Sequence, residues 1–478
     1  MKQPSRLNRY FSYLFYQVIN IIAPIILLPF LTRVLGPEKL GIVNFYDGLG
    51  QTFITICSAG VLVVATREMS NHSNEESRKS EVSSIFKFHL ISTILGIGVL
   101  IIYTILSYTD IDPTLLFCAS LMVFLSAFKF EYIFQGLNKF GFLAKRSLVI
   151  RILFVLSVLF FIKSPNDYKI YFIILTCSSL LYSIISLVFS YNHIYFFKFF
   201  NLGIVINGLR KSFKVSISNI LTGIYSNLDI LILVKFVSLR EVGIYVLGIK
   251  LVKFFSGIIN SFSVSEYPTM SKLYFEGSIQ TLHSTFRNIY LFILILTIPI
   301  AIFFSIYSSF IVTVISGTSF SESSVILKLA SSIIIFSTLN TILINQLAIF
   351  HKDLYILIYG ALALIAGVVI LYFFINLKGI LGAAFSVLSI EILCNIYLMI
   401  TVFKICKISF NLFQYIKVAF IGLFSFLSLF YLSNLFIFNQ ILSISFTGLV
   451  GLIIYYLLLD KFSVPVKQFI TKQFWIKN

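Results

Sequence analysis

Residues 31–41 read LTRVLGPEKLG, a short charged segment between two long apolar runs. The run before it is YQVINIIAPIILLPF (residues 16–30), and the run after it includes TFITICSAGVLVVA (residues 52–65). Gly36 and Pro37 favour the end of one helix, and Gly41 allows the next helix to begin close by. The segment therefore predicts a tight turn between two apolar helices. The turn is either a plain hairpin or part of a gate, and the sequence leaves both open.

The composition predicts a membrane protein. Of the 478 residues, 59% are hydrophobic and 11% are charged, whereas globular chains carry about 25% charged residues. The mean hydropathy is +0.99. A helix needs roughly 20 mostly apolar residues to cross a bilayer, and the strict alternation of a transmembrane barrel is missing from this sequence. We therefore expect an all-α polytopic membrane protein with about 14 transmembrane helices, near residues 12–31, 41–65, 84–107, 114–135, 147–163, 168–190, 213–236, 244–265, 288–306, 324–350, 354–375, 380–400, 412–432 and 439–459.

The basic residues predict the orientation in the membrane. The formal net charge is +18, with 36 Lys and Arg residues. If the N-terminus is cytoplasmic, Lys and Arg in the inside segments outnumber those in the outside loops about three to one. This asymmetry follows the positive-inside rule, so both termini are expected in the cytoplasm. The basic excess is explained by topology, and we expect no nucleic-acid partner.

The opening segment recurs later in the chain. Residues 233–243 read LVKFVSLREVG, and an offset of 202 places Gly41 on Gly243 and Arg33 on Lys235. At the same offset ATREMS (65–70) falls on YPTMSK (267–272). The sequence thus predicts two six-helix lobes related by a parallel repeat, residues 1–200 (spans 1–6) and 201–402 (spans 7–12). Residues 403–478 add a terminal helix pair, spans 13–14, and a cytoplasmic tail.

Four spans carry polar or small residues at helical spacing, which places them on one face of each helix. These are Arg9, Tyr13, Tyr16 and Asn20 in span 1; Asn44, Gly48, Gln51, Thr55 and Ser58 in span 2; and Ser218, Thr222, Tyr225 and Asp229 in span 7. The offset of 202 moves the span 2 positions to Val246, Lys250, Lys253, Gly257 and Asn260 in span 8. Polar side chains are costly in hydrocarbon, so the faces are expected to turn toward one cavity. Helix packing through small and hydroxyl residues is the alternative.

The charged residues within spans give the most specific expectations. Lys250 and Lys253 lie one turn apart, and two cations on one face require anions from a ligand or from the protein. Asp47 and Asp229 are the candidate protein partners. Glu391 in span 12 is expected to make an interior polar contact. Lys129 and Glu131 near the cytoplasmic end of span 4 are expected to pair with each other, and no His or Cys spacing predicts a metal site.

The quoted segments also resemble a known family. LLPFLTRVLGPEKLGIVNF followed by ATREMS is similar to the opening of the Wzx-type O-antigen flippases, which belong to the polysaccharide transporter family of the multidrug, oligosaccharidyl-lipid and polysaccharide exporter superfamily. SNLDILILVKFVSLREVGIYVLGIKLV with YPTMSKLY is similar to the start of that family's second half. The resemblance implies two lobes with spans 1, 2, 7 and 8 around a cation-lined lumen, matched here by Lys250 and Lys253. Arg33 and Arg67 match recurrent basic positions.

The resemblance further implies a cargo and a cellular setting. The expected cargo is an oligosaccharide repeat unit on undecaprenyl pyrophosphate, moved across the bilayer of the bacterial cytoplasmic (inner) membrane. The expected process is the biosynthesis of O-antigen, hence lipopolysaccharide, or of another surface polysaccharide. A polysaccharide polymerase and a chain-length regulator are the expected protein partners.

These expectations combine into a hypothesis of alternating access. Lys250 and Lys253 would hold the phosphates. Sugar hydrogen bonds would come from Asn44, Gln51, Tyr225 and Asn260. Asp47 or Asp229 is a candidate for coupling to a proton or sodium gradient. No P-loop motif occurs in the sequence, and no cofactor is expected.

Two other functions compete with this one. An ion-coupled multidrug exporter could share the fold, but a cavity for cationic drugs favours carboxylates over lysines. A membrane polymerase or glycosyltransferase is the enzymatic alternative, for which TDIDP (109–113) is the nearest motif. That motif lies in a very short predicted loop, and no catalytic Ser/His/Asp or Cys/His set accompanies it. We therefore expect a transporter and not an enzyme.

Overall fold

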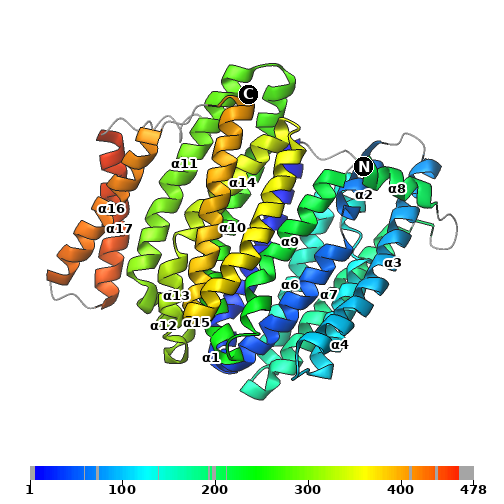
Figure 1. The fold of residues 1–478 in the computed structure, drawn as a ribbon, viewed down its shortest axis with the longest axis horizontal. Coiled ribbons are helices and arrows are strands. Elements are labelled where there is room, and N and C mark those ends of the chain that lie inside the picture. Colours follow the sequence, from blue (N-terminus) through cyan, green and yellow to red (C-terminus); the bar gives the residue numbers. More distant parts are fainter. Residues whose placement is uncertain are drawn as a thin grey trace. The chain divides into compact units, whose positions relative to one another are not determined.

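The computed structural model describes residues 6–58, 60–71, 75–137, 139–191, 194–195, 201–211, 213–408, 412–435 and 440–461. In this part of the chain all regular structure is helical (Figure 1). The helices are α1 (Arg6–Cys57), α2 (Val61–Asn71), α3 (Glu75–Ser107), α4 (Pro113–Ser126), α5 (Glu131–Gly136), α6 (Phe140–Phe161), η1 (Pro165–Asp167), α7 (Tyr168–Ser190), α8 (Leu202–Lys211), α9 (Phe213–Leu233), α10 (Leu239–Phe275), α11 (Ile279–Ile306), α12 (Ser308–Ser316), η3 (Thr318–Phe320), α13 (Ser323–Ala330), α14 (Ile333–Ile349), α15 (Asp353–Cys406), α16 (Leu412–Leu435) and α17 (Gln440–Lys461).

The two longest helices are each broken at a glycine. Gly36 in α1 has φ 72° and ψ 174°, and Gly379 in α15 has φ 54° and ψ −129°. These conformations are readily accessible only to a residue without Cβ, so each glycine ends one predicted span and starts the next. Predicted span 2 is itself interrupted between α1 and α2, where Gly60 has φ 71°. The helices correspond to the fourteen predicted spans when α1 and α15 are counted as two spans each. In this count α2, α5 and α13 are parts of longer spans. The helices α8 and α12 are connections between spans.

The outer surfaces of the helices are apolar. Seven described helices are long and apolar enough to cross a bilayer, and α13 with α14, bent by 42°, make an eighth. Large apolar side chains face outward on them, including Leu95 (65% exposed), Leu106 (80%) and Phe117 (67%). Soluble monomers rarely expose apolar patches of this extent. The expected all-α polytopic membrane fold is therefore confirmed.

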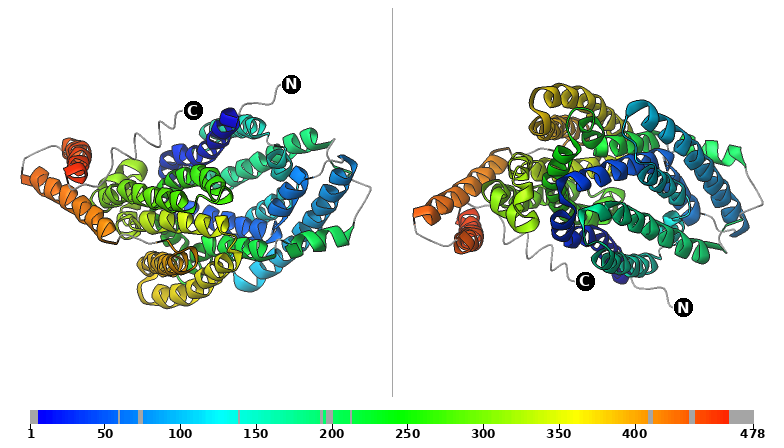
Figure 2. Two further views of the ribbon diagram at one scale, coloured as in Figure 1. Left: turned by 90° about the horizontal axis from the view of Figure 1, so that it is seen from above. Right: turned by 90° about the horizontal axis from the view of Figure 1, so that it is seen from below.

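The helices form two compact units. Unit 1 contains residues 1–246, 315–319 and 356–383, and α1 packs there against α6 and α9 while α4 packs against α7. Unit 2 contains residues 247–314, 320–355 and 384–478, and in it α11 packs against α14 and α16. Its last two helices, α16 and α17, lie side by side in Figure 1 and in both views of Figure 2. These units do not test the predicted lobe borders at residues 200 and 402, which stay predictions.

The repeated turns meet within unit 1. A Cβ atom built on Gly41 would lie 1.9 Å from the carbonyl oxygen of Leu239, and one built on Gly243 would lie 1.8 Å from that of Pro37. Leu239 follows Pro37 by 202 residues, as Gly243 follows Gly41, so the contact is the same in both directions. We call residues 36–41 and 238–243 the two corners. Positions that the repeat makes equivalent therefore contact each other here, and a Cβ atom on either glycine would collide with the opposing backbone.

Candidate functional site: the polar residues of the spans

The polar face of span 2 packs largely against α9. A Cβ built on Gly223 would lie 2.0 Å from Cγ2 of Thr55, and one built on Gly48 would lie 3.9 Å from Ile230. Asn44 is only 4% exposed, and its Nδ2 donates a 2.6 Å hydrogen bond to the carbonyl oxygen of Leu40. The packing interpretation therefore holds at Gly48 and Thr55. Asn44 is engaged with its own helix, so a contact between Asn44 and a sugar would require that bond to be exchanged.

Gln51 is the accessible member of this face. Its side chain is exposed, and Nε2 donates a 3.3 Å hydrogen bond to Oδ1 of Asp47. The structure thus places a predicted sugar contact beside a predicted coupling carboxylate. An amide and a carboxylate in this arrangement can both engage hydroxyl groups, because each retains hydrogen-bonding capacity.

Asp229 of α9 occupies a buried position, with 4% of its surface exposed. Oδ2 accepts a 2.8 Å hydrogen bond from the Tyr245 hydroxyl, and Oδ1 accepts one of 3.0 Å from the N–H of Ile230. Tyr225, one turn earlier, is half-buried, and its ring lies next to Gly367 of α15, where a Cβ would be 3.4 Å from Cδ2. The hydrogen bond between Asp229 and Tyr245 therefore links α9 to α10. Coupling of transport to an ion gradient by Asp229 would require this hydrogen bond to change.

The lysines of α10 belong to unit 2, and both Lys250 and Lys253 are exposed in a largely apolar stretch of that helix. Ammonium groups at such positions require water, protein or an anion, because hydrocarbon does not solvate them. Two turns beyond Lys253, Asn260 is half-buried, and its Oδ1 has no hydrogen-bond partner among the residues that the structure describes. This amide oxygen is free to accept a hydrogen bond from a ligand hydroxyl or from water.

The basic residues in and near the corners differ in their exposure and in their contacts. Arg33 is exposed on α1 just before the break. Lys39 bonds to Glu38 at 2.9 Å, and its Nζ lies 5.3 Å from the centre of the Tyr168 ring. Lys235 lies 5.5 Å from the ring centre of Tyr108. The side chain of Arg67, and those of the predicted face on span 1, lie outside the described part of the structure.

Two expectations about acidic residues have clear outcomes. Glu391 makes the interior polar contact expected of it, because Asn340 donates hydrogen bonds to its Oε2 (2.8 Å) and to its carbonyl oxygen (3.2 Å). The expected pairing of Lys129 with Glu131 is wrong. Glu131 pairs with Arg146, at 3.5 Å between Oε1 and Nη2, because the fully buried guanidinium reaches it from α6.

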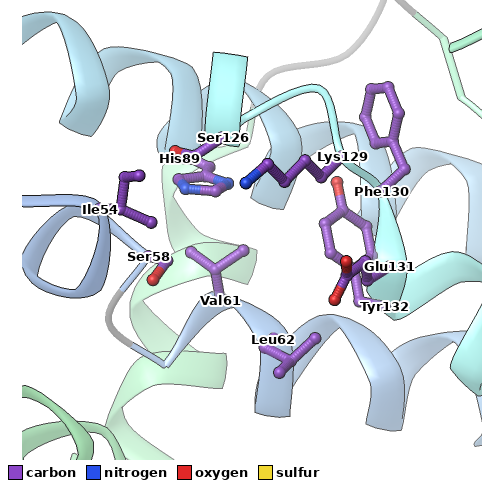
Figure 3. A pocket seen from close by; sticks show the side chains of 10 residues that line it. All are labelled: Ile54, Ser58, Val61, Leu62, His89, Ser126, Lys129, Phe130, Glu131 and Tyr132. Atoms are coloured by element: carbon purple, nitrogen blue, oxygen red, sulfur yellow. The ribbon is translucent and has the colours of Figure 1, made fainter. Parts of the chain in front are cut away.

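The pairing leaves Lys129 in a pocket that sequence reasoning missed. The pocket lies in unit 1, where the end of α1 and the start of α2 face α3 and the α4–α5 junction (Figure 3). Its walls are formed by Ile54, Ser58, Val61, Leu62, His89, Ser126, Lys129, Phe130, Glu131 and Tyr132. No spacing in the sequence connects His89 with Lys129, because His89 lies in α3 and Lys129 lies 40 residues further on, in the α4–α5 junction. Among the described residues, no group of three or more His, Cys, Asp or Glu side chains could hold a metal ion.

Comparison with known proteins places the chain in a family. Residues 7–274 match the family model described as polysaccharide biosynthesis protein. This match covers more than half of the chain. The chain belongs to this family. No curated protein sequence gives a significant match.

Solved structures show which fold this family member has. The structure of the lipid II flippase MurJ in an inward closed conformation is similar, with a TM-score of 0.75, 14% identity, and coverage of 95% of this chain and 99% of that one. An inward-facing multidrug resistance MATE family transporter of the MOP superfamily has a TM-score of 0.63 and 12% identity, with coverage of 86% and 97%. A point mutant of the Vibrio cholerae MATE transporter VcmN has a TM-score of 0.53 and 15% identity, with the same coverage. The chain thus shares the fold of these transporters, and its expected membership in a polysaccharide family is confirmed by the family model.

Proposed function

We propose that the protein is a flippase for undecaprenyl-pyrophosphate-linked oligosaccharide repeat units in the bacterial cytoplasmic membrane. Membership in the polysaccharide biosynthesis family carries this proposal, because it connects a transporter fold with sugar polymers. O-antigen, and thereby lipopolysaccharide, is the proposed product pathway, with both termini in the cytoplasm. A polymerase and a chain-length regulator are the proposed partners in the next steps.

The chemistry of the cargo fits the residues of the spans. A pyrophosphate and several sugars cannot cross about 30 Å of hydrocarbon without replacement of their hydration. Lys250 and Lys253 are accessible cations that could hold the phosphates, and Gln51 and Asn260 could bond to sugar hydroxyls. The polyprenyl chain could remain in lipid during the transfer. A protein that alternately exposes its site to each side would complete it.

The test is a transport assay with the α10 lysines changed. A strain that lacks the gene receives the wild type, K250A/K253A, or the control K272A. Lys272 lies on the same helix but is 76% exposed and pairs with Glu276. We expect the double variant to lose at least tenfold in outward transfer of lipid-linked oligosaccharide, at equal membrane levels, while K272A transfers normally. Normal transfer by K250A/K253A would remove the lysines from the mechanism.

The shared fold also favours a second candidate, an ion-coupled multidrug exporter. Uptake of a fluorescent cationic dye into everted vesicles, driven by a proton or a sodium gradient, distinguishes the two. A flippase is expected to show gradient-dependent transfer of the lipid-linked sugar and no dye transport. Dye transport without sugar transfer would favour the exporter.

A further inference from the structure

The pocket beside Lys129 has the properties of a separate ligand site. It encloses about 220 Å³, which is room for several water molecules at roughly 30 Å³ each. Five helices, α1 to α5, and the turns between them build it, and all of its lining residues lie within unit 1. In Figure 3 the ammonium group of Lys129 points at the imidazole of His89 across the pocket.

His89 is the first sign of a missing partner. His89 is only 4% exposed, and neither its Nδ1 nor its Nε2 has a hydrogen-bond partner among the described residues. Tyr132 is also 4% exposed, and its hydroxyl is likewise unpartnered there. A buried polar group without a partner is destabilising, so two of them lining one pocket indicate that something else fills it.

The surrounding charges decide which ligand fits. The charged neighbours of Lys129 are Glu131, Arg151, Arg146 and Asp47. Together with Lys129 these groups amount to three basic and two acidic side chains, so the neighbourhood of the pocket has an excess of one basic group. Glu131 is already engaged with Arg146, whose Nη1 also donates a 3.2 Å bond to the carbonyl oxygen of Lys129.

A cation would add to this excess, and an apolar ligand would leave the imidazole and the phenol unpaired. Water could satisfy the hydrogen bonds but would not balance the charge. A phosphate-type oxyanion does both, because its oxygens accept from ammonium, N–H and O–H donors. We propose that the pocket binds such an oxyanion through Lys129, His89 and Tyr132. The group is either free phosphate or the phosphate of a lipid headgroup.

The proposal is tested by binding to the purified full-length protein in a phosphate-free maltoside detergent. Isothermal titration with inorganic phosphate and pyrophosphate is compared for the wild type, K129M, H89Q, K129R and the control K145M. Lys145 is an exposed lysine of α6. We expect K129M and H89Q to weaken binding at least tenfold. K129R, which retains the charge, and K145M are expected to bind as the wild type does. Each variant is first required to elute as the wild type does in size exclusion.

The two sources are separated by titrating a short-chain phosphatidic acid beside inorganic phosphate. Tighter binding of the lipid by tenfold or more assigns the site to a headgroup, and equal binding assigns it to the free anion. No binding by the wild type at millimolar phosphate and lipid, or binding that K129M leaves unchanged, would overturn the proposal. K250A/K253A is expected to bind phosphate as the wild type does. Failure of the flippase proposal can therefore be distinguished from failure of the oxyanion-site proposal.

Discussion

A methyl group on Gly41 or Gly243 is expected to force the two corners apart. Built Cβ atoms at these positions lie 1.9 and 1.8 Å from the opposing carbonyl oxygens of Leu239 and Pro37. A carbon atom in non-bonded contact with a carbonyl oxygen lies about 3.5 Å from it, so each substitution requires a local shift of roughly 1.6 Å. Overpacking of this kind typically costs about 1–3 kcal/mol, which changes the ratio of closed to separated corners roughly 5- to 150-fold.

The two substitutions are also expected to be strongly non-additive. Once G41A has separated the corners, much of the space that G243A needs has already been made. The second substitution should then cost less than half of what it costs alone, which is the behaviour of residues that share one contact. Additive effects would show that the two glycines do not oppose each other.

Cysteine labelling measures the separation. Leu40 is 3% exposed beside the contact and becomes the reporter as L40C in a background without native cysteines. A membrane-impermeant maleimide should label it slowly in the parent and at least fivefold faster with G41A or G243A. The control is G98A in α3, where a built Cβ has no neighbour within 4 Å. Unchanged labelling in both corner variants, or equal acceleration by G98A, would refute the reasoning.

Three further substitutions test contacts within unit 1 by thermal unfolding in detergent. Y245F removes the 2.8 Å bond to the buried Asp229 and should cost about 1–3 kcal/mol, so an unchanged melting temperature would contradict a structural role for this bond. R146M removes a fully buried cation from its carboxylate partner and should cost about 3–5 kcal/mol, whereas a stability equal to that of wild type would show that the pair is dispensable. In the loop before α4, burial raises the pKa of Asp112, but the Lys169 ammonium, 2.8 Å away, and two backbone N–H groups outweigh burial and lower it overall. The stability that Asp112 contributes is therefore complete above about pH 4 and lost as the pH falls through the lowered pKa, so the difference between wild type and D112N should shrink from pH 6 to pH 3.

Much of the fold could be predicted because its causes are local in the sequence. Apolar runs of sufficient length predict membrane helices, and the Gly-Pro step at residues 36–37 predicts the break inside α1. The offset of 202 also predicted that Gly41 and Gly243 are equivalent, and the structure places them in contact. The interruption between α1 and α2 was missed because Ser58 and Gly60 lie in a continuous apolar run, where hydropathy alone cannot signal a turn.

The site was predicted less well because the same residue types serve two purposes. Glycine and hydroxyl residues at helical spacing allow close helix packing, and they can equally line a wet cavity. Gly48 and Thr55 follow the first use, since both lie against α9. The pocket at Lys129 escaped notice for a different reason: its polar groups converge only in three dimensions.

Whether a polar atom already has a hydrogen-bond partner distinguishes helix packing from ligand binding better than the position of its residue in the sequence pattern does. Asn44 and Asp229 belong to the predicted polar faces, yet both already have protein partners at 2.6–3.0 Å. His89 has unpartnered ring nitrogens, and Asn260 has an unpartnered amide oxygen, within the described part of the chain. A group that is buried and unsatisfied gains the most from an incoming ligand, because binding removes a cost that folding left in place. His89 and Asn260 are therefore stronger candidates for direct ligand contact than the more regular pattern of span 2.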